Sequence, residues 1–227
     1  MPNDIAIPRE IPVMTLTNTV LFPHAMLPLY IFEPRYRQML ADVLDRERLF
    51  VIAREDETRG QLTGEFEPAY PIASVGIVRA CQKDKDGCSH LILQGLARVR
   101  LLKILREEPY RLAEFEPLDT DPGASVDELQ SMRVELARSV RRRQELGSHA
   151  PSEVFDFLDG LHDPETYVDL ASFTLCEDND IKQQLLEMLD ASKRFARLKG
   201  YLEKSNTEML LERKLRGPLD QEQADRN

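Results

Sequence analysis

The side chains best suited to chemistry in this 227-residue chain are four histidines and three cysteines. They are His24, His90, His149, His162, Cys81, Cys88 and Cys176. A serine hydrolase would need a Gly-x-Ser-x-Gly elbow and a zinc protease a His-Glu-x-x-His helix, and neither motif occurs. Cys81, Cys88 and His90 resemble part of a soft-metal site, but the four ligands that such a site needs are not present. We therefore predict no catalytic residue, no metal site and no cofactor.

The net charge of the chain is −10, and it is unevenly distributed. Residues 1–118 carry 15 basic and 17 acidic side chains, whereas residues 119–227 carry 15 and 23. An acidic chain lacks the basic footprint that nucleic acids need, so a nucleic acid is not the expected partner. Residues 153–190 hold eleven acids and one base, which indicates solvated helix surface, with binding to a basic partner as the alternative.

The cellular setting is predicted from segments that the sequence lacks. The first residues have neither the basic region nor the apolar run of a signal peptide. No window approaches the ~20 apolar residues that cross a membrane. An odd number of cysteines at no metal-like spacing fits a reducing compartment. We therefore expect a cytoplasmic protein without membrane contact, and the sequence leaves its oligomeric state open.

The first half of the chain is predicted to be rich in β-strands. Pro28 interrupts one of them and favours an edge position, and Asp86-Gly87 supplies the turn of a hairpin. Gly95 interrupts a continuous strand pattern and indicates a bulge or a barrel corner. The predicted strands span residues 11–16, 27–32, 49–53, 74–81, 89–94, 97–105 and 110–115, with one helix after Pro34 and an exposed loop over 55–69. Such a set predicts a small closed or semi-closed sheet around one helix.

The second half is predicted to be helical. Ser125 and Glu128 form a capping box that opens a helix, and Asp190 is suited to cap a long last helix. Apolar spacing indicates three further helices between them. The predicted fold class is therefore α+β. The predicted domains are a β-barrel subdomain over 9–118, a linker over 119–124, a helical subdomain over 125–216 and a disordered tail over 217–227.

The segment Val20–Tyr30 holds more apolar residues than one face of a strand can bury. A proline-stiffened loop with methionine and aromatic side chains can form a pre-ordered binding surface. We assign Leu29 and Ile31 to the core, with Phe22, Met26 and Tyr30 in a groove; the alternative is that the whole segment completes the core. The predicted protein-binding residues are Phe22, Pro23, Met26 and Tyr30.

Three sequence blocks resemble the N-terminal, substrate-binding domain of Lon-type ATP-dependent proteases over roughly residues 9–215. The first block runs from Ile11 to Glu33. The second joins Val75-Gly76 to Gly95-Leu-Ala-Arg-Val-Arg100, and the third is Leu185-Leu-Glu-Met-Leu-Asp190 followed by Arg194 and Leu198. The resemblance implies a six-stranded PUA-like pseudo-barrel with one helix, followed by a helical bundle.

The resemblance does not extend to the ATPase and protease domains of Lon. None of the ten glycines is followed by lysine, so a Walker A loop is absent, and we expect no room for a protease domain. The resemblance implies a stand-alone, non-enzymatic module that binds unfolded or damaged polypeptides in protein quality control, with a separate protease as a further partner. Two alternatives stay open: a PUA-like domain that binds a small ligand or RNA, and an enzyme of unrecognised type.

Overall fold

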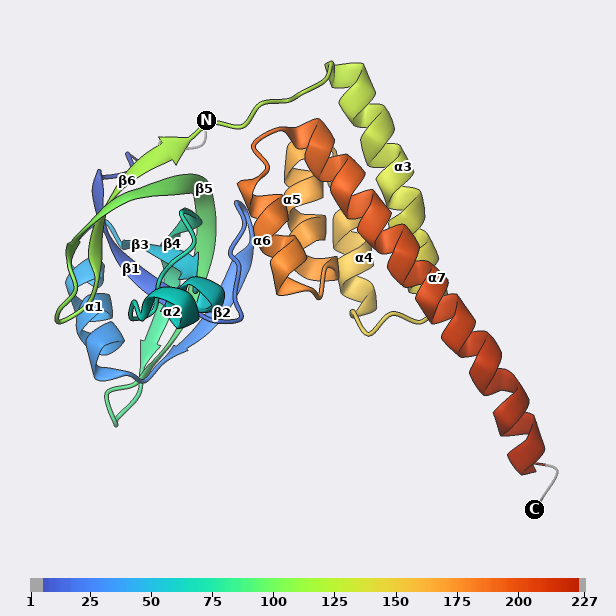
Figure 1. The fold of residues 1–227 in the computed structure, drawn as a ribbon, viewed down its shortest axis with the longest axis horizontal. Coiled ribbons are helices and arrows are strands. Elements are labelled where there is room, and N and C mark those ends of the chain that lie inside the picture. The colour runs from blue at the N-terminus through green and yellow to red at the C-terminus, as the bar shows by residue number, and fades with distance from the viewer. Residues whose placement is uncertain (1–5, 225–227) are drawn as a thin grey trace. The chain divides into compact units, whose positions relative to one another are not determined.

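The computed structural model describes the backbone of residues 6–224 and the side chains of residues 6–215. The chain forms two compact units. The strand unit contains the residues up to Thr120 together with Asp178–Leu189, and the helical unit contains Asp121–Glu177 together with the chain from Asp190. The predicted α+β class is confirmed (Figure 1).

Six strands build the strand unit: β1 (Glu10–Leu16), β2 (Met26–Ile31), β3 (Leu49–Arg54), β4 (Ile72–Lys83), β5 (Ser89–Arg106) and β6 (Leu112–Leu118). Their order is β2-β5-β4-β3-β1-β6, and β5 also pairs with β6. This additional pairing closes five strands into a ring and leaves β2 outside it, bonded to β5 alone (Figure 1). Pro28 therefore lies on an edge strand, as predicted, where its lack of an N–H leaves no hydrogen bond to a second neighbouring strand unmade.

The core of the strand unit is built by alternate residues of the ring strands. Val13, Val51, Val75, Val99 and Phe115 are among its fully buried members. Helix α1 (Pro34–Leu44) begins with proline at its first position, where no backbone N–H is needed, and turns an apolar stripe towards the strands. Burial of these side chains supplies the main stabilisation of the unit.

Strand β5 bends where the sequence predicted an irregularity. Val75 pairs with Ala97 and Gly76 pairs with Gly95, so Leu96 is the extra residue of a bulge. A β-carbon on Gly76 would lie 2.7 Å from the Leu93 side chain, which explains why a glycine is used there. Because of this bend, the long β5 pairs with β2 and β4 in its first part and with β6 in its last part.

Helix α2 (Glu57–Thr63) lies within the segment predicted to be an exposed loop, and that prediction is wrong for these residues. Asp56 caps the helix by accepting a hydrogen bond from the Arg59 N–H at 3.0 Å. Gly64 ends it in the left-handed region at φ 71°. None of its residues is buried, so the sequence carries no apolar stripe that would reveal it.

Helix α6 (Asn179–Glu187) belongs to the strand unit although its neighbours along the chain are helical. The Nε of the buried Arg98 donates to the Leu186 carbonyl at 3.0 Å, and the Gln183 amide donates to the Ile72 carbonyl at 3.0 Å. These bonds tie the helix to β4 and β5. The predicted helical subdomain over 125–216 is therefore interrupted, because α6 belongs to the strand unit. Hydrogen bonds between residues far apart in the sequence decide this, and no local pattern predicts them.

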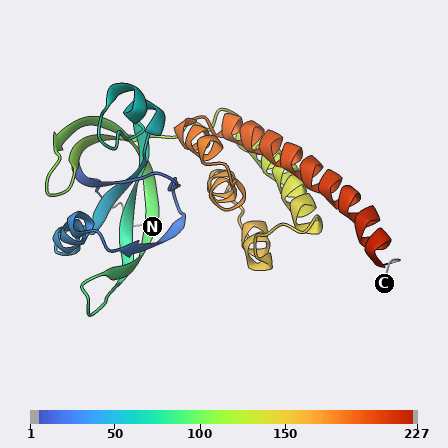
Figure 2. The same ribbon diagram turned by 60° about the horizontal axis from the view of Figure 1, so that its bottom comes forward.

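The helical unit contains α3 (Val126–Glu145), α4 (Ser152–Asp159), α5 (Pro164–Leu175) and α7 (Ala191–Ala224). The capping box of Ser125 and Glu128 is present, and Asp190 accepts from the Lys193 N–H at 3.1 Å at the start of α7. Helices α3 and α7 run side by side (Figure 2). None of the helices in the described part of the chain is long and apolar enough to span a membrane.

The observed helical unit extends beyond both predicted ends of the helical subdomain, residues 125 and 216. Part of the predicted linker docks on the helical unit, since the Ala191 N–H donates to the Asp121 carbonyl at 2.8 Å. The backbone of α7 is helical over residues 217–224, where the sequence predicts a disordered tail. Residues 225–227 of that tail lie outside the described residues.

Candidate functional site

The outer face of β2 presents four exposed residues at alternate positions. They are Met26, Pro28, Tyr30 and, just beyond the strand, Phe32, and we call them the β2 patch. Met26 and Tyr30 are each 48% exposed and Phe32 is 59% exposed. Successive side chains of a strand point to opposite faces, so Ile31 turns into the core while these residues face outwards.

Aromatic rings give the β2 patch a defined surface. The Tyr30 ring lies 5.9 Å from the Phe32 ring and 4.6 Å from the ring of His90 on β5. Beside them is a groove of about 690 Å³, lined by Pro28, Leu29, Tyr30, Ala80, Cys81, Gln82, His90, Leu91 and Ile92. An apolar surface of this kind, set in a polar rim, is typical of a site that binds another molecule.

The hydroxyl of Tyr30 is held in its neutral form. A hydrogen bond with Cys88 is the main cause that raises the Tyr30 pKa to about 12, and the negative charges of Asp84 and Asp86 raise it further. The β2 patch therefore presents an uncharged phenol at every pH at which a folded protein is normally studied. This neutral surface suits apolar ligands.

Two of the four predicted binding residues are buried. Phe22 has no exposed surface, and Pro23 is also buried. The expectation that Phe22 lines a groove is wrong in this structure, while Met26 and Tyr30 are exposed as expected. Their role in binding stays a prediction.

Phe22 is buried because the segment before β2, residues 20–25, docks on the bend of β5. The His24 N–H donates to the Gly95 carbonyl and the Gly95 N–H donates to the Ala25 carbonyl, each at 2.9 Å. The Ser74 hydroxyl donates to the Leu21 carbonyl at 2.6 Å. A β-carbon at position 95 would overlap the Phe22 carbonyl oxygen, so glycine is what allows the approach.

The histidines and the buried cysteine of the strand unit do not converge on a catalytic centre. His90 lies 3.4 Å from Asp84 on the β4–β5 hairpin, and His24 is exposed on its loop. Cys88 is buried next to Tyr30. Among residues 6–215, no three His, Cys, Asp or Glu side chains are grouped so that they would hold a metal ion.

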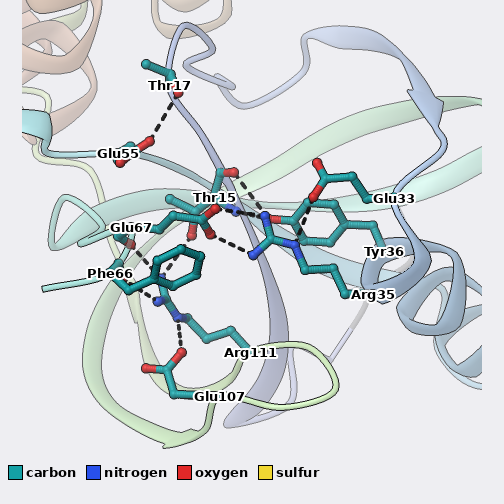
Figure 3. A network of polar contacts seen from close by, with 10 residues as sticks. All are labelled: Thr15, Thr17, Glu33, Arg35, Tyr36, Glu55, Phe66, Glu67, Glu107 and Arg111. Carbon is teal, nitrogen blue, oxygen red and sulfur yellow. Dashed lines mark hydrogen bonds and ion pairs between the residues drawn. The ribbon is translucent and has the colours of Figure 1, made fainter.

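A second hollow of the strand unit has a volume of about 800 Å³, and we call it the Glu-lined cavity. One wall carries Arg35, which forms two hydrogen bonds of 2.8 Å to the Glu67 carboxylate and one of 3.0 Å to Glu33 (Figure 3). The bonds to Glu67 are the main cause that raises the Arg35 pKa above its usual range. Burial raises the pKa of Tyr36 beside it, which therefore also stays neutral.

The lining of the cavity also includes the buried Arg111. Its guanidinium donates to the backbone carbonyls of Phe66 and Glu67 at 3.1 and 2.8 Å, and to the Glu107 carboxylate at 2.9 Å (Figure 3). Two arginines thus hold one loop, and Glu67 within it has a positive φ of 44°. Phe66, whose carbonyl accepts one of these hydrogen bonds, lines the cavity with a side chain that is 71% exposed.

Sequence reasoning missed several of these residues. Phe32 continues the alternation that begins at Met26, so the strand period could have revealed it. His90 joins the patch only through the pairing of β2 with β5. Phe66 and Arg111 are 45 positions apart, and no local pattern signals their contact.

Comparison with known proteins identifies the family. The family model described as "ATP-dependent protease La (LON) substrate-binding domain" matches residues 10–204. The Lon protease of Desulfosudis oleivorans is 23% identical over 194 residues, which are 85% of this chain and 23% of that protein. Lon protease 2 of Herpetosiphon aurantiacus is 27% identical over 215 residues, 94% of this chain and 26% of that protein. The chain spans about a quarter of the length of these curated relatives.

Solved structures of Lon N-terminal domains share the fold. The N-terminal domain of the Mycobacterium avium complex Lon protease superposes with a TM-score of 0.65 at 17% identity, covering 86% of this chain and 98% of that one. A Lon N-terminal domain protein from Xanthomonas campestris gives 0.60 at 18% identity, covering 85% and 98%. With the family match over residues 10–204, these findings show that the chain belongs to the family of Lon substrate-binding domains.

Proposed function

We propose that this protein is a non-catalytic module that binds unfolded polypeptides through the β2 patch. The observation that carries the proposal is the row of exposed apolar side chains on the outer face of β2. An unfolded chain exposes the apolar side chains that such a surface can cover, and burial of apolar area is favourable. The family match supports recognition of polypeptides as the general role.

The proposed mode of binding is contact between side chains and not the addition of a strand to the sheet. The free edge of β2 would be the natural place for an added strand, but Pro28 in its middle offers no N–H. Methionine and aromatic side chains on a flat strand face can instead adapt to many apolar partners. Broad recognition is what a protein that screens unfolded chains needs.

The proposal assigns recognition, and not cleavage, to this chain. The family match concerns the substrate-binding domain, and the sequence has neither a Walker A loop nor a nucleophile elbow. In protein quality control the module would hold damaged polypeptides and deliver them to a separate protease. This role is part of the proposal.

Binding of fluorescent, denatured casein, followed by anisotropy with and without ATP, tests the proposal. We expect binding without cleavage in both conditions. Tyr30→Ser should weaken the binding about fivefold or more, since a central aromatic anchor contributes about 1 kcal/mol or more. Leu102→Ser is the matched control, because Leu102 is also 48% exposed but lies outside the patch, in the β5–β6 hairpin.

Two results would overturn the proposal. Cleavage of casein by the pure protein would show that the chain is an enzyme. Equal losses of affinity in Tyr30→Ser and Leu102→Ser would show that any exposed apolar residue serves, and the β2 patch would then have no special part.

A further inference from the structure

The β2 patch and the Glu-lined cavity are joined by two consecutive residues of the chain, at the junction of β2 and α1. Phe32 is the last residue of the patch, and the next residue, Glu33, lines the cavity. Both sites lie in the strand unit. A polypeptide extended along the outer face of β2 advances about 3.3 Å per residue, so one that continues past Phe32 brings its next side chains towards Glu33, a residue of the cavity lining.

The cavity is negatively charged after its own ion pairs are made. Its lining contains five glutamates and two arginines. Arg35 pairs with Glu33 and Glu67, and Arg111 pairs with Glu107. Glu65 pairs with Arg59, which lies outside the lining, so carboxylates outnumber guanidinium groups by two when this pair is included. Glu108 is exposed at the cavity and takes no part in these ion pairs. Charge of this sign favours a cationic ligand.

The walls of the cavity also suit the flat or apolar part of a cationic side chain. The Arg35 guanidinium lies 4.5 Å from the centre of the Tyr36 ring and 6.0 Å from that of the exposed Phe66 ring. The protein thus already holds one guanidinium here between aromatic faces and carboxylates. A second cation can use the same two interactions, because the hollow leaves about 800 Å³ beside them.

We infer that the Glu-lined cavity binds the arginine or lysine side chain of a polypeptide whose apolar residues lie on the β2 patch. The inference rests on the proposed function and names its substrate class: unfolded segments in which a basic residue follows alternating apolar ones. Neither the cavity nor the patch selects acidic segments. The module would therefore prefer basic apolar segments to acidic ones of equal hydrophobicity.

Two fluorescein-labelled peptides test this inference on the full-length protein. Both carry apolar residues at alternate positions, followed by one arginine in the first peptide and by its uncharged isostere citrulline in the second. At low salt we expect the arginine peptide to bind about fivefold more tightly, which is the size expected for an exposed charge pair. The preference should shrink as salt is added.

Glutamine variants test whether the glutamates of the cavity cause the preference for the arginine peptide. Glu65→Gln/Glu108→Gln should bring the ratio of the two affinities close to one, while the affinity for the citrulline peptide stays unchanged. The control is Glu10→Gln/Glu116→Gln, which removes the same charge from strands β1 and β6 of the same unit and should keep the ratio. Circular dichroism confirms that each variant is folded, and a set of exposed glutamates is expected to tolerate the change.

The outcomes separate the inference from the proposed function. Equal binding of both peptides to the natural protein overturns the inference, and the proposed function stands if Tyr30→Ser still weakens both. A preference for arginine that survives in Glu65→Gln/Glu108→Gln also overturns the inference, because the basic side chain would then be bound at another place on the protein. Binding of neither peptide overturns the inference and the proposed function together.

Discussion

The segment 20–25 and strand β2 follow each other in the chain and are both mainly apolar, yet they end in opposite environments. Val20, Leu21, Phe22 and Ala25 are buried, whereas in β2 only Ile31 is buried, Leu27 and Leu29 are half-buried, and Met26 and Tyr30 are exposed on the other face. The segment before β2 is anchored by backbone hydrogen bonds to the bend of β5. Strand β2 is held by one neighbour only and keeps its outer face free.

Apolar content alone does not separate a binding surface from a core. A loop that can approach a glycine closely is drawn into the structure, because each buried apolar side chain contributes stability. An edge strand is limited by its period of two, and every second residue faces outwards whatever its type. Stability and recognition are therefore divided between two consecutive segments.

The largest expected effect separates one substitution in the anchored segment from one in the exposed face of β2. Phe22→Ala should lower the free energy of unfolding of the strand unit by about 4 kcal/mol, because it leaves a cavity in a fully buried site. Phe32→Ala removes the same atoms from a side chain that is 59% exposed. It should change the free energy of unfolding by about 0.5 kcal/mol or less. Hydrogen exchange of the β4 and β5 amides measures the strand unit by itself. Similar losses in both variants would end the distinction.

The role of Gly95 is tested by adding one carbon atom. Gly95→Ala should cost about 2 kcal/mol, since the new methyl group displaces the Phe22 carbonyl, and it should open residues 20–25 to proteolysis. The control is Gly200→Ala in α7, where an added β-carbon meets no heavy atom within 4 Å. There alanine should be neutral or stabilising by up to about 1 kcal/mol, because it is the better helix former. Unchanged proteolysis of Gly95→Ala would show that the segment is anchored by other contacts.

The smallest expected effect is on the titration of Tyr30, in the exposed face of β2, at high pH. Tyr30 should titrate near pH 12, and Cys88→Ala should move its pKa back towards 10, because the hydrogen bond with Cys88 is the main cause of the shift. The folded state favours the neutral phenol, so this contribution to stability is complete below pH 10 and is lost as the pH rises towards 12. Carbon-13 shifts of labelled tyrosines measure the titration, with Tyr30→Phe to assign the signal. A Tyr30 that titrates at 10 in the natural protein would contradict the shared hydrogen bond.

Much of the fold could be predicted from local signals. The strands, the hairpin turn at Asp86-Gly87 and the capping box at Ser125 each depend on residues that are close in sequence. Helix α2 was missed because it buries nothing and so has no apolar period. Helix α6 was recognised as a helix but not as part of the strand unit, since Arg98 lies 88 positions from its partner Leu186.

The candidate site was predictable only in part. Met26 and Tyr30 were found from their residue types on a proline-stiffened segment, and their exposure agrees with that prediction. Phe22 has the same kind of side chain, and its burial depends on Gly95, more than seventy positions away. The Glu-lined cavity gave no sequence signal at all, because its residues come from α1, the loop after α2 and the β5–β6 connection.

The family, the α+β class and the period of each element follow from the sequence, because they depend on residue order and on local backbone preferences. Which apolar residues remain exposed, and which carboxylates surround one hollow, depends on the tertiary structure. Burial depends on what approaches from elsewhere in the chain, as the Phe22 backbone approaches Gly95. For that reason the block from Ile11 to Glu33, which carries one family resemblance, folds into a core strand, an anchored segment over 20–25 and an edge strand with an exposed face.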